Sequence, residues 1–153
     1  MWPLTVLVFF VLGILSLRGV RWAYVTFVVL GLLYFPVSVG FRLDPRACQL
    51  AIDLPLALFS LTNYAHMGLF ALFFVITSAQ LRMVTQSALV RAGLATLVMG
   101  ALVEIAQGIT GNGNCRLRDL VPDSAGAFLG TAIVFLWNKT RTLPRSGQHE
   151  SPA

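Results

Sequence analysis

Charged side chains are scarce in this sequence: of its 153 residues, only 11% are Asp, Glu, Lys or Arg. Soluble domains average about 25% charged and roughly 45–50% apolar residues. Here 57% of the residues are hydrophobic and the mean hydropathy is +0.79. So few charges cannot cover the surface of a soluble globule, and disorder is excluded because it requires low hydrophobicity and high charge. The composition predicts an integral membrane protein with a single domain.

Several functional motifs are also missing. The chain has no P-loop, no dinucleotide fingerprint and no nucleophile elbow, and it has no His-Glu-x-x-His or cysteine cluster for a metal. Its 11 basic and 6 acidic residues give a net charge of +5, but they form no basic stripe of the kind that nucleic-acid-binding proteins carry. We therefore expect no metal, no cofactor and no nucleic-acid partner.

What the sequence does contain is a series of long apolar runs. They cover residues 2–17, 22–41, 61–81, 88–109 and 120–137, and the third can begin as early as Leu54. None has a charged opposite face at helical period, and none alternates in polarity as barrel strands do. The runs predict an all-α, polytopic transmembrane helical bundle. We expect one membrane domain over residues 1–141 and a disordered cytoplasmic tail over residues 142–153.

The first run is short for a membrane span. Sixteen helical residues rise about 24 Å, against a hydrocarbon core of about 30 Å. A signal peptide is the alternative, but it needs positive charges before the apolar run. Here Arg18 and Arg21 follow the run, which favours a retained helix extended by snorkelling arginines.

Basic residues predict the orientation in the membrane. Seven of them share one predicted side: Arg18, Arg21, Arg82, Arg91, Lys139, Arg141 and Arg145. Four lie on the other side: Arg42, Arg46, Arg116 and Arg118. The positive-inside rule places the first group in the cytoplasm. We expect a multi-pass protein of the cell membrane, surrounded by membrane lipids, with its N-terminus outside and its C-terminus cytoplasmic.

Cys48 and Cys115 are the only cysteines. The predicted orientation places both in extracytoplasmic loops, on the side that can be oxidising. A disulfide between them is one alternative and two unpaired thiols are the other, because a sequence does not supply the distance that a disulfide requires.

Polar and ionisable residues gather at the predicted outer ends of three runs. Ionisable groups inside a membrane are costly and usually face an interior or a cavity. The i, i+3 and i, i+4 spacings in the fourth and fifth runs put their polar pairs on one helix face. The set that we expect to share one ligand-binding cleft is His66, Glu104, Gln107, Arg116, Arg118, Asp119 and Asp123.

Two kinds of role are open to these residues. His66, Glu104 and Asp119 are the candidates for acid–base catalysis, and an arginine can bind phosphate. Purely structural roles are the alternative: Asp119 as a helix cap, Asp123 at the positive end of a helix dipole, and Glu104 paired with His66 or an arginine.

Gly126 and Gly130 form a Gly-x-x-x-Gly motif in the last run. Small residues at this spacing allow two helices to approach closely. The motif predicts packing within the chain, with a homo-oligomer as the second alternative.

These residues, in this order, resemble the VanZ-like family of bacterial integral membrane proteins. The resemblance rests on His66 with Phe70, the Glu-x-x-Gln of residues 104–107, the loop at 116–119 and the glycines of 126–130, and it extends from about Trp22 to Trp137. Asp123 stands where the family has Asn. The resemblance implies a four-helix core, to which the first run is an extra N-terminal hydrophobic helix. It also implies a role in the cell envelope, where the family's named member is linked to resistance to teicoplanin, a glycopeptide antibiotic.

Three functions follow as hypotheses. The first is a VanZ-like protein that binds a lipid-linked or amphipathic envelope molecule. The second is an intramembrane acid–base enzyme acting on a lipid phosphate. The third is a structural or assembly subunit that works through Gly126 and Gly130.

Overall fold

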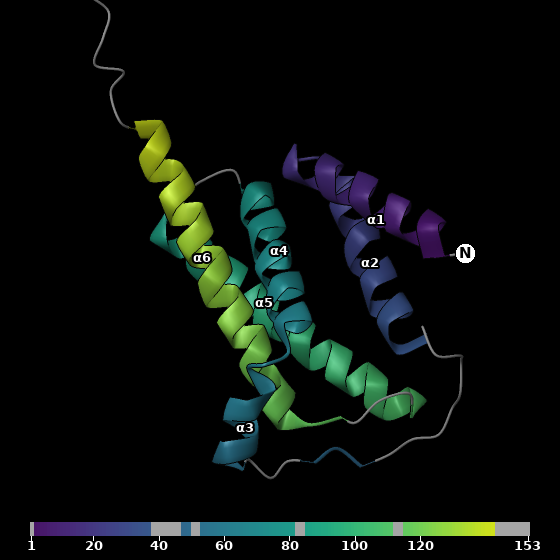
Figure 1. Cartoon of the computed structure of the whole chain (residues 1–153). Helices are drawn as coiled ribbons and strands as arrows, with labels where there is room; N and C mark the ends of the chain where they lie inside the picture. Colours follow the sequence, from purple (N-terminus) through teal and green to yellow (C-terminus); the bar gives the residue numbers. More distant parts are fainter. Residues whose placement is uncertain (1, 38–46, 50–52, 82–84, 112–114, 143–153) are drawn as a thin grey trace, which may run out of the picture.

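The structure is a computed structural model that describes residues 2–37, 47–49, 53–81, 85–111 and 115–142 (Figure 1). Within these residues the elements are all helical, which confirms the predicted all-α class. They are α1 (Trp2–Leu17), α2 (Arg21–Val37), α3 (Leu54–Ser60), α4 (Tyr64–Leu81), α5 (Gln86–Thr110), the 3₁₀ turn η1 (Leu117–Asp119) and α6 (Leu120–Thr142).

Three of these helices are long and apolar enough to cross a membrane: α4, α5 and the stretch Leu117–Thr140 that contains most of α6. The apolar parts of α1 and α2, Pro3–Leu17 and Arg21–Tyr34, are shorter. The three long helices indicate a multi-pass membrane protein. Residues 38–41 of the second predicted run and residues 143–153 of the predicted tail lie outside the described residues. The last helix continues beyond the predicted Trp137 to Thr142.

The apolar stretch from Leu54 onward is divided into two helices. The Asp53 side chain accepts a hydrogen bond from the Leu56 N–H (3.3 Å) and starts α3, whose first turn contains Pro55. Backbone hydrogen bonds of a turn at residues 61–63 then end that helix. Asn63 Oδ1 accepts the His66 N–H at 3.4 Å, so that α4 begins at Tyr64 and not at the predicted residue 61. His66 therefore lies in the first turn of a long helix.

The glycines of the last helix form its contact with α4. A Cβ added at Gly126 would lie 2.6 Å from the Met67 carbonyl oxygen, and one added at Gly130 would lie 2.9 Å from the Ala71 carbonyl oxygen. These two helices run in the same direction, with α5 running oppositely against both (Figure 1). The Gly-x-x-x-Gly motif thus packs within the chain, and its role in a homo-oligomer stays a prediction.

The two N-terminal helices pack on the α4–α5 side of this group (Figure 1). Gln80 Nε2 donates to the Ser16 carbonyl at 2.5 Å, and the Tyr24 hydroxyl lies 3.2 Å from Thr77 Oγ1. The Phe9 ring of α1 meets the Phe27 ring of α2 edge-on, with centroids 5.6 Å apart. The two polar contacts therefore join α1 and α2 to α4, and the aromatic contact joins α1 to α2.

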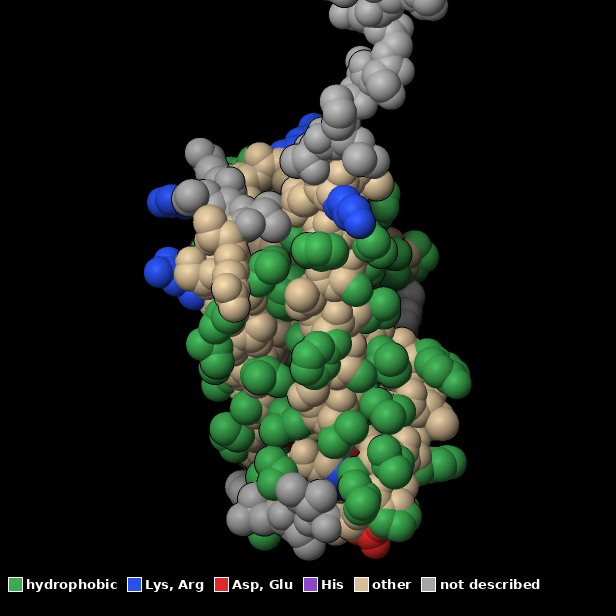
Figure 2. All heavy atoms as spheres, turned by 90° about the vertical axis from the view of Figure 1, so that its left-hand side faces the viewer, with side chains coloured by type: hydrophobic (Ala, Val, Ile, Leu, Met, Phe, Trp, Pro, Cys, Tyr) green, Lys and Arg blue, Asp and Glu red, His purple; other side chains and the backbone are tan. Residues whose placement is uncertain are grey.

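The two ends of the helical bundle differ in which helix termini and which charged residues they contain. The first turns of α4 and α6 lie toward the lower end in Figure 1, and α5 ends toward the same end, farther to the right. The α1–α2 connection and the end of the last helix lie at the upper end. On the face shown in Figure 2, Lys and Arg gather mainly toward that upper end, hydrophobic side chains cover the middle, and acidic side chains occur only near the lower end. This asymmetry agrees with the charge distribution that the sequence predicts.

Candidate functional site

His66 and Asp123 are in direct contact at the lower end of the three long helices. His66 Nδ1 lies 3.1 Å from Asp123 Oδ1. The Asp123 side chain is only 1% exposed, while His66 is 25% exposed. An ionised Asp123 only accepts hydrogen bonds; in that state Nδ1 of His66 carries the shared hydrogen and Nε2 remains for another partner. A buried acid thus orients a half-buried imidazole.

Glycine makes room for this carboxylate on a third helix. Asp123 Oδ2 lies 2.5 Å from the position that a Cβ would take at Gly100 of α5, and the Leu120 side chain lies 3.3 Å from it. Any larger residue at position 100 would have to displace one or both side chains. The His66–Asp123 pair is therefore enclosed by all three long helices.

Glu104 anchors the chain that leads into η1. Its Oε2 accepts the Arg116 backbone N–H at 2.8 Å, and its side chain is 5% exposed. Arg116 Nε is itself buried and has no hydrogen-bond partner among the described residues. Glu104 therefore pairs with the Arg116 backbone N–H, and the buried Nε of the same arginine has no hydrogen-bond partner among the described residues.

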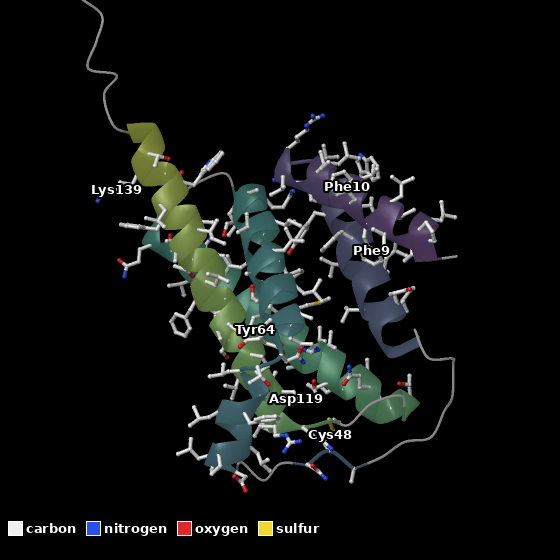
Figure 3. All side chains as sticks on the ribbon, viewed as in Figure 1. Phe9, Phe10, Cys48, Tyr64, Asp119 and Lys139 are labelled. Carbon is white, nitrogen blue, oxygen red and sulfur yellow. A yellow bond between two sulfur atoms is a disulfide. The ribbon has the colours of Figure 1, made fainter. Side chains whose placement is uncertain are left out.

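Asp119, labelled in Figure 3, and its neighbour Arg118 form the more exposed edge of the cluster. Arg118 Nε lies 3.8 Å from Asp119 Oδ1, and both side chains keep roughly a quarter of their surface exposed. Ser60 of α3 donates to the Ala57 carbonyl and contacts the Arg118 carbonyl at 3.3 Å. Glu104 and Asp119 also lie near enough to His66 to interact with it electrostatically. Acidic, basic and imidazole groups thus share one small region.

Most of the residues predicted to converge do so, but not as one polar cleft. Gln107 is the exception within the described part of the chain, because no hydrogen bond there joins its side chain to the cluster. The partner of Glu104 is neither His66 nor an arginine side chain but a backbone N–H. Sequence reasoning missed Gly100 and Asn63. The available signal for Gly100 was its position one helical turn before Glu104, a carboxylate within an apolar helix.

Cys48 and Cys115 form a disulfide next to this cluster (Figure 3). The bond lies on α5 where Gly108 leaves space, since a Cβ there would be 3.2 Å from Cys48 Sγ. Directly after the two cysteines, Gln49 N–H donates to the Cys115 carbonyl (2.9 Å) and Leu117 N–H donates to the Gln49 carbonyl (3.1 Å). The disulfide therefore holds the segment that presents the Arg116 N–H to Glu104.

We expect no titratable thiol in the denatured, unreduced protein and two after reduction. Replacing both cysteines by serine should lower the free energy of unfolding by about 2–4 kcal/mol, because the cross-link restricts the unfolded chain. Thiol titration and a denaturant titration in detergent measure the two effects. Two thiols without reductant would contradict the pairing.

An apolar cavity lies beside the polar cluster, between α1, α2, α4 and α5. Its volume is about 490 Å³, and its walls include Phe9, Phe27, Phe70, Phe73 and Met99. Of the predicted polar set, His66 alone is among the residues that line it. The hollow is therefore a hydrocarbon-lined space with an imidazole in its wall, where the sequence predicted a cleft lined by seven polar residues.

The described residues contain no group of three His, Cys, Asp or Glu side chains placed to hold a metal ion. Comparisons with protein-family models, with curated proteins and with solved structures found no match to this chain. Its chemistry therefore has to be inferred from the site itself. An oriented imidazole can donate, accept or transfer a proton at Nε2, and arginine can bind an anionic oxygen.

Proposed function

We propose that this chain is a VanZ-like membrane protein of the bacterial cell envelope that binds the polar part of a lipid-linked or amphipathic molecule at the lower end of its long helices. The observation that carries the proposal is the His66–Asp123 contact at 3.1 Å, with Asp123 1% exposed. Burying a charge is costly unless it is paired, and here the pairing leaves Nε2 of the imidazole for a ligand.

The proposed site faces the extracytoplasmic side. Arg18, Arg21, Arg91 and Lys139 belong to the opposite ends of their helices, and the positive-inside rule places such an end in the cytoplasm. The disulfide beside the cluster supports the same orientation, because disulfides persist on the oxidising side of a membrane. The N-terminus of α1 would then lie outside and the end of the last helix inside.

The ligand's polar part is proposed to be anionic. Arg116 Nε is a buried donor without a hydrogen-bond partner among the described residues, and unsatisfied buried donors are rare in folded proteins. A phosphate oxygen would satisfy it. Arg118, whose exposed fraction is 22%, would supply a second donor at the edge of the cluster.

Alanine at Glu104 or Asp119 should abolish the envelope phenotype while the protein stays in the membrane. Glu104→Ala leaves the buried Arg116 N–H without its acceptor, at a cost of about 1–3 kcal/mol. The measurement is the teicoplanin concentration that inhibits a susceptible bacterium expressing each variant, with membrane abundance determined by immunoblot. The wild-type chain should raise that concentration several-fold, and both alanine variants should not.

Glu104→Gln is the matched control, because its amide oxygen still accepts the Arg116 N–H. A variant that keeps the anchor but loses activity would show that the negative charge is needed. Full resistance in both alanine variants would count decisively against the proposal.

An intramembrane acid–base enzyme is the second candidate, and the same contact favours it. A buried carboxylate that fixes the tautomer of an imidazole is the arrangement by which His serves as a general base. The two candidates differ in turnover. If the chain is an enzyme, purified protein releases product from a lipid phosphate with a pH profile that His66→Gln alters; binding of the same lipid without product favours the first candidate.

A further inference from the structure

The polar cluster described above does not use the cavity between α1, α2, α4 and α5. His66 nevertheless lines this cavity and also belongs to the polar cluster. We propose that this cavity holds one hydrocarbon chain, alkyl or polyprenyl, of a lipid phosphate. The inference rests on the proposed function, because the phosphate end of the same molecule would be the ligand of the polar cluster.

The size of the cavity fits a single chain. A water molecule takes about 30 Å³ in the liquid and a methylene group is of similar size, so about 490 Å³ holds on the order of 15 methylene groups. A helix with its side chains is roughly 10–12 Å across, and the same volume would contain only about one turn of it. A transmembrane helix of a partner protein therefore does not fit.

The lining also favours hydrocarbon over water. Buried water needs two to four polar partners, whereas aromatic and aliphatic side chains dominate these walls. The Phe9 ring packs against Phe27 and Tyr34, with centroids 5.6 and 5.9 Å away, and Tyr24 stacks on Phe73 at 6.4 Å. Aromatic rings in contact with one another thus make up much of the cavity wall.

The position of His66 determines the orientation of the bound lipid phosphate, with its hydrocarbon chain in the cavity and its phosphate toward the polar cluster. Its ring lies 6.0 Å from the Phe70 ring, which lines the cavity, while its Nδ1 is committed to Asp123. The imidazole therefore stands at the boundary between the hydrocarbon walls and the polar cluster. A chain in the cavity would place its phosphate at this boundary, where His66 lines the space; the arginines of the cluster do not line the cavity themselves.

Photolabelling tests the inference. The full chain in phospholipid nanodiscs is labelled with hexadecyl phosphate bearing a mid-chain diazirine, and with the matching hexadecane that lacks the phosphate. Labelled positions are mapped by peptide mass spectrometry. We expect both probes to label Phe9, Phe27 and Phe73 above Phe128, which is 78% exposed on α6 and reports the surrounding lipid. Cavity labelling no higher than that of Phe128 would overturn the inference.

Gly31→Leu is the variant that fills the cavity. Gly31 lines it, and a Cβ there is already 3.4 Å from Met99 Cε, so a leucine side chain occupies the chain's space. Labelling of the cavity by both probes should fall about tenfold. Gly68→Leu is the matched control, since a Cβ at Gly68 meets nothing within 4 Å. Val103→Phe fills the same cavity from α5 if Gly31→Leu does not fold.

His66→Ala separates this inference from the proposed function. If both hold, labelling by the alkyl phosphate falls and labelling by hexadecane does not. If neither probe is affected, the hydrocarbon site stands and the proposed polar site is wrong. Cavity labelling that survives both filling variants would overturn the hydrocarbon site itself.

Discussion

Replacing Gly126 with alanine is expected to force α6 away from α4 and to lower the free energy of unfolding by about 1–3 kcal/mol. The added Cβ would lie 2.6 Å from the Met67 carbonyl oxygen and 2.9 Å from Phe70 Cβ. Neither atom can rotate away, because one is backbone and the other is attached to it. The Gly126→Ala/Gly130→Ala double variant should lose more than either single one, since both Cβ atoms meet the same helix.

The measurement is a denaturant titration in detergent micelles followed by far-ultraviolet circular dichroism. Gly68→Ala is the matched control, because it also adds one methyl group to a glycine of a long helix but meets open space. We expect that control to be at least as stable as the wild type, since alanine is the better helix former. A Gly126→Ala protein as stable as Gly68→Ala would contradict the close packing.

The sequence was sufficient for the all-helical class, for the three long apolar helices and for the end of the molecule at which the polar residues meet. Long apolar runs without period-2 alternation predict helices, and the run predicted at residues 88–109 is observed as Gln86–Thr110. Helices joined by short connections alternate in direction, so the start of α4, the end of α5 and the start of α6 must come together. This follows from chain connectivity and needs no side-chain detail.

The pairing inside the cluster could not be predicted in the same way. The sequence offered Glu104 as a partner for His66 or an arginine, whereas His66 pairs with Asp123 and Glu104 binds a backbone N–H. Two glycines decide this. Gly126, one turn after Asp123, sets the α6 register against Met67, and Gly100 leaves space for the carboxylate on α5. A glycine permits such a contact because it has no side chain to fill the space, and hydropathy does not measure this.

The break before α4 and the apolar cavity have other causes. The stretch from Leu54 is apolar on both sides of residues 61–63, so hydropathy alone cannot separate the two helices. The turn at residues 61–63 does so, with the Asn63 side-chain oxygen accepting the His66 N–H at 3.4 Å where α4 begins. The cavity depends on how α1 and α2 pack against α4, and their apolar residues carry no pattern that specifies a partner face.

Removing the carboxylate of Asp123 is expected to have the largest effect on function. Breaking a buried pair by removing one partner costs about 3–5 kcal/mol, and Asp123→Ala should fall at the lower end because His66 keeps 25% of its surface exposed. The proposed teicoplanin resistance and the proposed labelling by the alkyl phosphate should both be lost, since His66 no longer has its orienting partner. Stability alone would explain such a loss, so a second variant is needed.

The His66→Phe/Asp123→Leu double variant separates the two explanations. Replacing a buried ion pair by apolar residues of similar size is often neutral or stabilising, and leucine branches at Cγ as aspartate does. We expect its free energy of unfolding to return to within about 1 kcal/mol of the wild type, while resistance and phosphate labelling stay absent. Such a protein would be folded, present in the membrane and inactive. If the double variant instead regains resistance, the pair only holds the three helices together, and the polar ligand has to bind elsewhere.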